Sequence, residues 1–255
     1  MLYACDIGNT NIKVATFDLG VISSYYKFSD LNKLFDFFKK NNPSHLALSS
    51  VVPESENEIN QFIKTNFNFS PFIINHKIKF NLLIDYHPIE NLGLDRICSA
   101  EGALFLFKNS NDYINYSSKS VIVTIDLGTA TTINVVKYPQ IFSGGLIAPG
   151  INMMFNSLSK DTALLPSVGL NDYKQIISHD TKSSLASGVI NSTLGLIERT
   201  LASIQKIYPA EKLKIFITGG NAKDFLPHFD FEFQFEKALV LLGIKAIYDK
   251  NTQTN

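Results

Sequence analysis

The chain has 255 residues, enough for one large domain or two of ordinary size. Apolar residues make up 45% and charged residues 18%, a balance that supports a full hydrophobic core and excludes a disordered chain. Basic and acidic residues number 23 each, so no net charge attracts nucleic acid or an anionic membrane, and we expect neither as a partner.

Other global features point to the cytoplasm. Two cysteines, Cys5 and Cys98, are too few for a disulfide framework and lack the spacing of a zinc site. The first charged residue is Asp6, so the start of the sequence does not resemble an export signal. The longest apolar runs, 121–125 and 238–244, are far shorter than the ~20 residues of a membrane helix. We therefore expect a soluble, cytoplasmic protein.

The first half of the chain alternates strand and helix patterns. Apolar runs at 2–5 and 12–17 flank a polar turn and predict a β-hairpin. Helices are predicted at 31–40, at 54–67 behind Pro53, and at 95–107, and strands at 45–52 and 72–74. The polar stretch 108–119 then predicts a domain boundary, which divides the chain into residues 1–115 and 116–255.

The second half begins with the same pattern. Strand-like runs at 121–125 and 131–136 flank another acidic turn, and one offset of 120 residues separates Asp6 from Asp126 and Gly8 from Gly128. Further elements are predicted after a glycine-rich segment at 144–150: helices at 183–207 and 236–248, a strand at 213–218, and strand periodicity over 225–235. We infer a duplication that gives two related α/β lobes with a cleft between them.

The two acidic turns are the candidate chemical motif. An Asp at the end of a strand, followed by Gly and a small polar residue, suits a phosphate and metal site, because Gly lets the backbone approach closely and the carboxylate can hold a divalent ion. A single turn of this kind is more often a plain hairpin. Two copies in duplicated lobes reverse that preference, since both could converge on one polyphosphate.

The ordered motifs of the chain resemble those of type III pantothenate kinases, in the superfamily of actin, sugar kinases and heat-shock chaperone ATPases. They are Asp6-Ile7-Gly8-Asn9-Thr10, Ser50-Val51-Val52-Pro53, Gly93-Leu94-Asp95-Arg96, Asp126-Leu127-Gly128-Thr129-Ala130-Thr131-Thr132, the glycine-rich segment 144–150, Thr162-Ala163-x-Leu165-Pro166 and Thr218-Gly219-Gly220. The resemblance implies two actin-like (ribonuclease H-like) α/β lobes around a central nucleotide cleft. It also implies ATP-dependent phosphorylation of pantothenate to 4'-phosphopantothenate, the first step of coenzyme A biosynthesis.

The resemblance also assigns roles to individual residues. Asp95 matches the catalytic proton acceptor, Asp6 the carboxylate associated with Mg²⁺, and Asp126 the ligand of a monovalent cation, K⁺ or NH₄⁺. The implied ATP-binding residues are Asp6, Ile7, Gly8, Asn9, Thr10, Asn11, Ile12, Lys13 and Thr129. The implied substrate-binding residues are Tyr86, Gly93, Leu94, Asp95, Arg96 and Thr181. The resemblance also implies a homodimer with the active site near the subunit interface, and the helix from Ile97 to Phe107 and the segment after Gly150 are candidate interface material.

Several of these residues also have purely structural interpretations. Asp95 and Thr181 each precede or begin a helical pattern, so either could be a helix N-cap. Arg96 could grip a carboxylate or phosphate at two points, or could form an ion pair with an acid such as Glu101. Lys13 could be a solvated strand residue, and Tyr86 could be half-buried packing.

The sequence departs from the family pattern at two positions, and two other functions are also compatible with it. The family often has Gly at Ala15 and Asp at Asn134, and the second change removes a charge near the proposed cation site. The alternative functions are a non-enzymatic transcriptional accessory factor and another small-molecule kinase on the same fold. The absence of a P-loop motif argues against the type I pantothenate kinase architecture.

Overall fold

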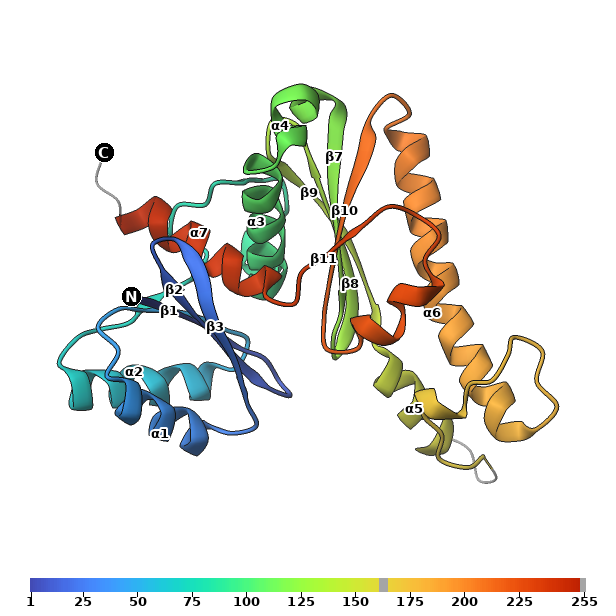
Figure 1. Ribbon diagram of the computed structural model, residues 1–255, viewed down its shortest axis with the longest axis horizontal. Coiled ribbons are helices and arrows are strands. Elements are labelled where there is room, and N and C mark those ends of the chain that lie inside the picture. Colours follow the sequence, from blue (N-terminus) through green and yellow to red (C-terminus); the bar gives the residue numbers. More distant parts are fainter. Residues whose placement is uncertain (161–164, 253–255) are drawn as a thin grey trace. The chain divides into compact units, whose positions relative to one another are not determined.

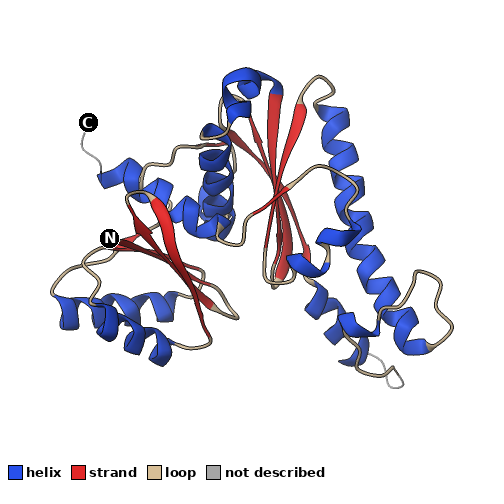
Figure 2. Cartoon of the chain, in the orientation of Figure 1, coloured by secondary structure: helices blue, strands red, loops and turns tan. Residues whose placement is uncertain are grey.

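The computed structural model describes residues 1–160 and 165–252, so positions 162–164 of the predicted Thr162–Pro166 motif lie outside the described residues. The chain forms two mixed sheets with helices packed against them (Figures 1 and 2). By contact clustering it divides into two compact units. Unit 1 comprises residues 1–118, 134–144 and 238 onward, and unit 2 comprises residues 119–133 and 145–237.

The first sheet has five strands in the order β3-β2-β1-β4-β5. Their bounds are Leu2–Ile7 (β1), Ile12–Asp18 (β2), Val21–Phe28 (β3), Leu46–Ser50 (β4) and Phe72–Ile73 (β5). β1 pairs antiparallel with β2 and parallel with β4, while β2 pairs antiparallel with β3 and β4 pairs parallel with β5. The predicted hairpin and strands are confirmed, and β3 is an additional strand.

The second sheet repeats this arrangement. Its order is β11-β10-β7-β8-β9-β6, so β9-β8-β7-β10-β11 matches β3-β2-β1-β4-β5 strand for strand. The bounds are Leu83–Ile84 (β6), Ser120–Leu127 (β7), Ala130–Lys137 (β8), Ile141–Pro149 (β9), Lys212–Thr218 (β10) and Gln234–Phe235 (β11). The repeated order is what a duplication of one α/β lobe predicts. The glycine-rich segment 144–150 is largely the second half of β9.

The five predicted helices are all present, and two further helices occur at Asn111–Tyr116 and Ile151–Lys160. They are α1 (Leu31–Asn41), α2 (Pro53–Phe67), α3 (Leu94–Lys108), α4 (Asn111–Tyr116), α5 (Ile151–Lys160), α6 (Thr181–Ile207) and α7 (Leu239–Thr252). Short 3₁₀ helices occur at 89–91, 117–119, 170–172, 222–224 and 226–228. Within the described residues no helix is long and apolar enough to cross a membrane. The polar stretch 108–119 contains α4 and a 3₁₀ turn. The division at residue 115 stays a prediction.

One expected strand is largely wrong. Over 225–235 only Gln234 and Phe235 pair with β10, as β11. Phe229, Phe231 and Phe233 instead pack on one another, with the ring centroids of the first two 5.0 Å apart. The segment begins with two short 3₁₀ helices and therefore does not run as an extended strand beside β10. Its alternating aromatic residues form a local cluster instead.

Alternation along β1 determines which side chains of unit 1 face which helices. Tyr3, Cys5 and Ile7 belong to the core formed with α1 and α2. Ala4 belongs to the opposite core, which contains Cys98 of α3 and the apolar face of α7. Because successive strand residues point to opposite faces, Asp6 lies on the α3 and α7 side of the sheet.

Candidate active site

The turn between β1 and β2 places a buried acid beside a lysine. Asp6 is 7% exposed and lies directly opposite Lys13 in the strand register, with its Oδ2 3.7 Å from the Lys13 Nζ. The Gly8 amide donates to the Asn11 carbonyl at 3.1 Å and closes the turn. Lys13 is therefore a cross-strand partner of Asp6, not a freely solvated residue.

The other predicted ATP-binding residues of this turn differ in exposure. Ile7 and Ile12 are buried in the core on the α1 and α2 side, so their side chains stabilise the turn and only their backbone can face a nucleotide. Asn9 and Thr10 are exposed at the tip of the turn, and Gly8 and Asn11 are half-buried. The turn thus offers backbone amides and short polar side chains to a phosphate.

Asp6 and Asp95 interact electrostatically. Burial raises the pKa of Asp6, the nearby Lys13 ammonium lowers it, and the negative charge of Asp95 raises it again, with a net value of about 6. Strand alternation accounts for this proximity, because Asp6 points to the side of the sheet on which α3 lies. The structure therefore brings together two of the three acids singled out from the sequence.

Asp95 lies in the first turn of α3 and is not the helix cap. The N-cap is Gly93, which has no side chain to donate or accept a capping bond, so the capping interpretation of Asp95 is wrong. A methyl group on Gly93 would overlap the Asp95 carboxylate, so the carboxylate folds back over the start of the helix. Leu94 begins the helix, and the whole 93–96 motif forms one compact turn.

Arg96 is buried, with 4% of its surface exposed, and is held from three sides. Its Nε donates to Oδ1 of Asn134 at 2.6 Å, and its Cζ lies 5.9 Å from the ring centroids of both Tyr86 and Phe142. Its Nη2 is also buried, and no hydrogen-bond acceptor reaches it within the described residues. The expected alternative, an ion pair with Glu101, is wrong.

The second acidic turn lies in unit 2, between β7 and β8. Asp126 is near the end of β7, and a Cβ on Gly128 would lie 3.1 Å from its Oδ1, so the carboxylate folds over this two-residue turn. The Gly128 amide donates to the Ala130 carbonyl at 3.1 Å, and Asn221 Nδ2 donates to the Gly128 carbonyl at 3.2 Å. Thr129 is exposed at the tip.

Two glycines let other backbone segments approach this turn. Gly219 has φ +110° and packs against the backbone of Leu127, and a methyl group on Gly150 would overlap the carbonyl oxygens of Gly128 and Thr129. Both glycines belong to sequence motifs that the resemblance identified. Their physical role is to admit close backbone contact around the Asp126 turn.

Thr181 is the first residue of α6 and is exposed. The cap of this helix is Asp180, whose carboxylate accepts from the Ser183 amide and hydroxyl at 2.9 Å each, so the capping interpretation of Thr181 is wrong. The hydrogen bonds from Ser183 are the main reason that the pKa of Asp180 falls to about 2. The Thr181 side chain is left available at the start of the helix.

The predicted site residues are thus distributed over the two units. Unit 1 contains the turn 6–13, Tyr86 and the 93–96 motif, and unit 2 contains Asp126, Thr129 and Thr181. Sequence reasoning did not identify Phe142 or Asn221, whose roles depend on contacts with residues far away in the chain. It noted Asn134 only as a lost charge, whereas the structure gives it a direct bond to Arg96.

The donor set fits a magnesium ion that is bound mainly through nucleotide phosphates. The residues described contain no group of three or more His, Cys, Asp or Glu side chains that could form a metal site by themselves. Kinase Mg²⁺ sites commonly use one or two carboxylates together with phosphate oxygens and water. Asp6, a single buried carboxylate at a phosphate-type turn, matches that pattern.

Two sheets of the same strand order, each with an acidic hairpin turn, define a protein of the actin-like ATPase and sugar-kinase class. Comparisons with known proteins identify the family. A family model described as type III pantothenate kinase matches residues 2–203. Type III pantothenate kinases from Sulfurihydrogenibium sp. and Thermosipho africanus are 30% and 31% identical, over 96% and 98% of this chain and 98% of each relative. The chain belongs to the type III pantothenate kinase family.

Solved structures support the fold. A chain described as a conserved putative Baf family transcriptional activator from Campylobacter jejuni matches with a TM-score of 0.60, at 20% identity and with 98% of both chains covered. A putative N-acetylmannosamine kinase from Listeria monocytogenes matches with a TM-score of 0.54, at 13% identity, over 98% of this chain and 99% of its own. At these identities the likeness concerns the fold alone.

Proposed function

We propose that Asp95 is the general base when this chain phosphorylates pantothenate with ATP, the reaction of its family and the first step of coenzyme A biosynthesis. The observation that carries this proposal is the position of Asp95 directly before Arg96 in the first turn of α3, because the buried Nη2 of Arg96 has no acceptor within the described residues. A substrate carboxylate would supply that acceptor, and pantothenate has one carboxylate. The substrate would then be held at one end by Arg96, with its hydroxyl near Asp95.

The chemistry follows from these two residues and the β1–β2 turn. Asp95 takes the proton of the substrate hydroxyl while the hydroxyl oxygen forms a bond to the γ-phosphorus, and the bond from that phosphorus to the ADP oxygen breaks. Amides of the Gly8 turn bind phosphate oxygens. Asp6 would hold the divalent ion, which would neutralise charge on the phosphates.

We assign the monovalent cation, K⁺ or NH₄⁺, to Asp126. Support comes from the way the carboxylate folds over the Gly128 turn, where backbone carbonyls are also close, since oxygen ligands of this kind suit such ions. Thr129, at the tip of the same turn, is the proposed nucleotide contact. Asn134 belongs to the Arg96 site, so its neutrality bears on substrate binding.

We also propose that the protein acts as a homodimer and that Thr181 contacts substrate. Support for the homodimer comes from the exposed large apolar side chains of unit 2, which include Ile147, Met153, Ile176 and Ile177 at 49% to 71% exposure. The helix at 97–107, the other candidate interface, is instead mostly buried against α7 within the chain. A cytoplasmic location stays a prediction.

The proposal is tested by following ADP release and the mass of the product with ATP, Mg²⁺, K⁺ and pantothenate. Wild-type protein is expected to form 4'-phosphopantothenate only when all substrates are present. Asp95→Asn is expected to lower kcat by about 10²- to 10⁴-fold with little change in melting temperature, as the loss of a general base does. ADP release that is indifferent to pantothenate would indicate another small-molecule kinase, and no turnover would contradict an enzymatic role.

A further inference from the structure

A buried carboxylate of α3 fixes the segment that precedes the predicted substrate residue Tyr86. Glu101 is 1% exposed. Its Oε1 accepts from the backbone amides of Asn81 and Leu82 at 2.7 and 2.9 Å, and its Oε2 accepts from Asn81 Nδ2 at 2.9 Å. One side chain thus anchors two consecutive residues that lie about 20 positions away in the sequence.

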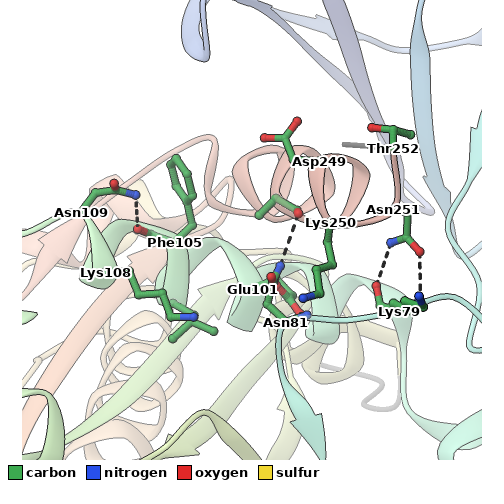
Figure 3. Close-up of a pocket in the computed structure, with 12 residues that line it drawn as sticks. Lys79, Asn81, Glu101, Phe105, Lys108, Asn109, Asp249, Lys250, Asn251 and Thr252 are labelled. Atoms are coloured by element: carbon green, nitrogen blue, oxygen red, sulfur yellow. Dashed lines mark hydrogen bonds between the residues drawn. The ribbon is translucent and has the colours of Figure 1, made fainter. Parts of the chain in front are cut away.

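The same segment is also fastened to α7, as Figure 3 shows. The Lys79 amide donates to Asn251 Oδ1 at 3.1 Å, and Asn251 Nδ2 donates to the Lys79 carbonyl at 2.8 Å. Asn81 Nδ2 also donates to the Ala246 carbonyl at 3.3 Å. These groups line a polar pocket of about 870 Å³ that contains none of the predicted catalytic residues.

The anchored segment leads directly to the Arg96 site. β6 follows at once and pairs with β9, with Ile84 opposite Phe142, and the Asp85 amide donates to the Phe142 carbonyl at 3.0 Å. Tyr86 comes next, its ring 6.5 Å from the ring of Phe142 and 5.9 Å from the Arg96 guanidinium. Glu101 and Arg96 lie on the same helix, so the anchor and the group that Tyr86 must meet are rigidly connected.

A buried carboxylate such as that of Glu101 is not the side chain expected at a purely structural contact. Burial raises the pKa of its carboxyl, while the hydrogen bonds from Leu82 and Asn81, followed by the charge of Lys108, favour the ionised form. A buried charge is expensive, and well-packed apolar residues usually stabilise a core at least as well. The carboxylate accepts hydrogen bonds from three donors of one segment, which an apolar side chain cannot do. It thereby fixes the position of that segment relative to α3.

We propose that Glu101 is a positioning residue that sets the affinity of the site for pantothenate by holding Tyr86 against Arg96. This inference rests on the proposed function, since it assumes that the carboxylate of the substrate binds at Arg96. Glu101 does not touch the reacting atoms. Its loss therefore changes substrate affinity much more than the rate of the chemical step.

The test compares Glu101→Gln and Asn81→Ala with a matched control. Glu56→Gln removes another helical carboxylate whose burial raises its pKa, and Glu56 forms no bond to the 79–86 segment within the described residues. Loss of hydrogen bonds to a charged group predicts that KM for pantothenate rises about 10-fold in each test variant. We expect kcat and KM for ATP to change less than about 2-fold, because the anchor acts on neither the chemical step nor ATP binding. The control variant should match wild type.

A double variant and hydrogen exchange complete the design. Because both residues act through one contact, Glu101→Gln with Asn81→Ala should raise KM little more than either change alone. Amide exchange should accelerate at residues 81–86 and stay unchanged at residues 46–50. Unchanged exchange at 81–86, or an equal fall of kcat and kcat/KM, would overturn the inference. Accelerated exchange in a protein whose wild type does not use pantothenate would contradict the proposed function and leave the anchor established.

Discussion

The guanidinium of Arg96 is held at one nitrogen and open at another. Its Nε donates to Asn134 Oδ1 at 2.6 Å, and its Nη2 has no acceptor within the described residues although both nitrogens belong to one buried side chain. Because Asn134 is neutral, this bond orients the guanidinium without cancelling its charge. The full positive charge therefore remains to bind an anionic group.

Arg96→Met is predicted to raise KM for pantothenate by about 10- to 100-fold, the usual effect of losing a hydrogen bond to a charged group. The matched measurement uses the alcohol analogue of pantothenate, in which a hydroxymethyl group replaces the carboxylate. Wild type should strongly prefer the acid, and the variant should not discriminate. If the preference for the acid persisted in the variant, the carboxylate would bind elsewhere.

The raised pKa of Asp6 predicts that magnesium binding depends on pH. Its pKa is raised to about 6, so the carboxylate is ionised above that pH and protonated below it. The Mg²⁺ concentration for half-maximal activity should therefore increase as pH falls from 7.5 to 5.5. Asp6→Asn should weaken Mg²⁺ dependence at both pH values. A half-maximal concentration that is constant over this range would contradict the assignment.

The same shift predicts an opposite effect on folding stability. The folded pKa of Asp6 lies above its ordinary value of 3.8, so the folded state binds the proton more tightly than the unfolded state. The stabilisation is complete below pH 3.8 and is lost as pH rises through about 6. Urea unfolding should show that Asp6→Asn gains stability relative to wild type between pH 5 and pH 7.

Gly243→Ala is predicted to destabilise the protein by about 2 kcal/mol, because overpacking at a closed contact carries a cost of this order. A methyl group there would overlap the Cys98 carbonyl of α3, and one on Gly102 would overlap the Leu239 carbonyl of α7. The control is Gly188→Ala in α6, where nothing lies within 4 Å and helix propensity predicts a gain of about 0.5 to 1 kcal/mol. The urea midpoint of unfolding should fall for Gly243→Ala and rise for Gly188→Ala.

Asp126→Asn is predicted to remove the dependence of activity on monovalent cations. Wild-type activity should rise with K⁺ at constant ionic strength maintained with a tetraalkylammonium salt, and NH₄⁺ should substitute for K⁺. The variant should show low activity that does not respond to either ion. If Asp126→Asn retained the wild-type K⁺ response, the cation would bind at another place.

Local patterns were sufficient to predict most of the fold. The two hairpins were recognisable because apolar runs flank turns of Asp, Gly and Thr, and the helices because their apolar residues recur at helical spacing. Strand β3 was missed, since Val21–Phe28 is half-exposed and has no clear alternation. The alternating Phe residues after position 225 led to a wrong strand prediction, because a local aromatic cluster has the same alternating pattern as a strand.

The site was predictable only where a motif is continuous in sequence. The 6–13 turn and the 93–96 motif could be found, but the bond from Arg96 to Asn134 joins residues 38 positions apart and has no local signature. The same limit explains why an ion pair with Glu101 was one of the two alternatives for Arg96. Both residues lie on one helix, yet the carboxylate meets amides that a distant segment delivers.

The position of α7 has a consequence for how the chain is made. Residues 238–247 complete the core that covers the Ala4 and Ala47 side of the first sheet, a sheet whose strands are all formed from residues before 74. A ribosome therefore releases β1 and β2 long before the helix that shields them. We expect that α7 cannot cover this face until the last residues have been made, so the first sheet reaches its final packing only late in synthesis.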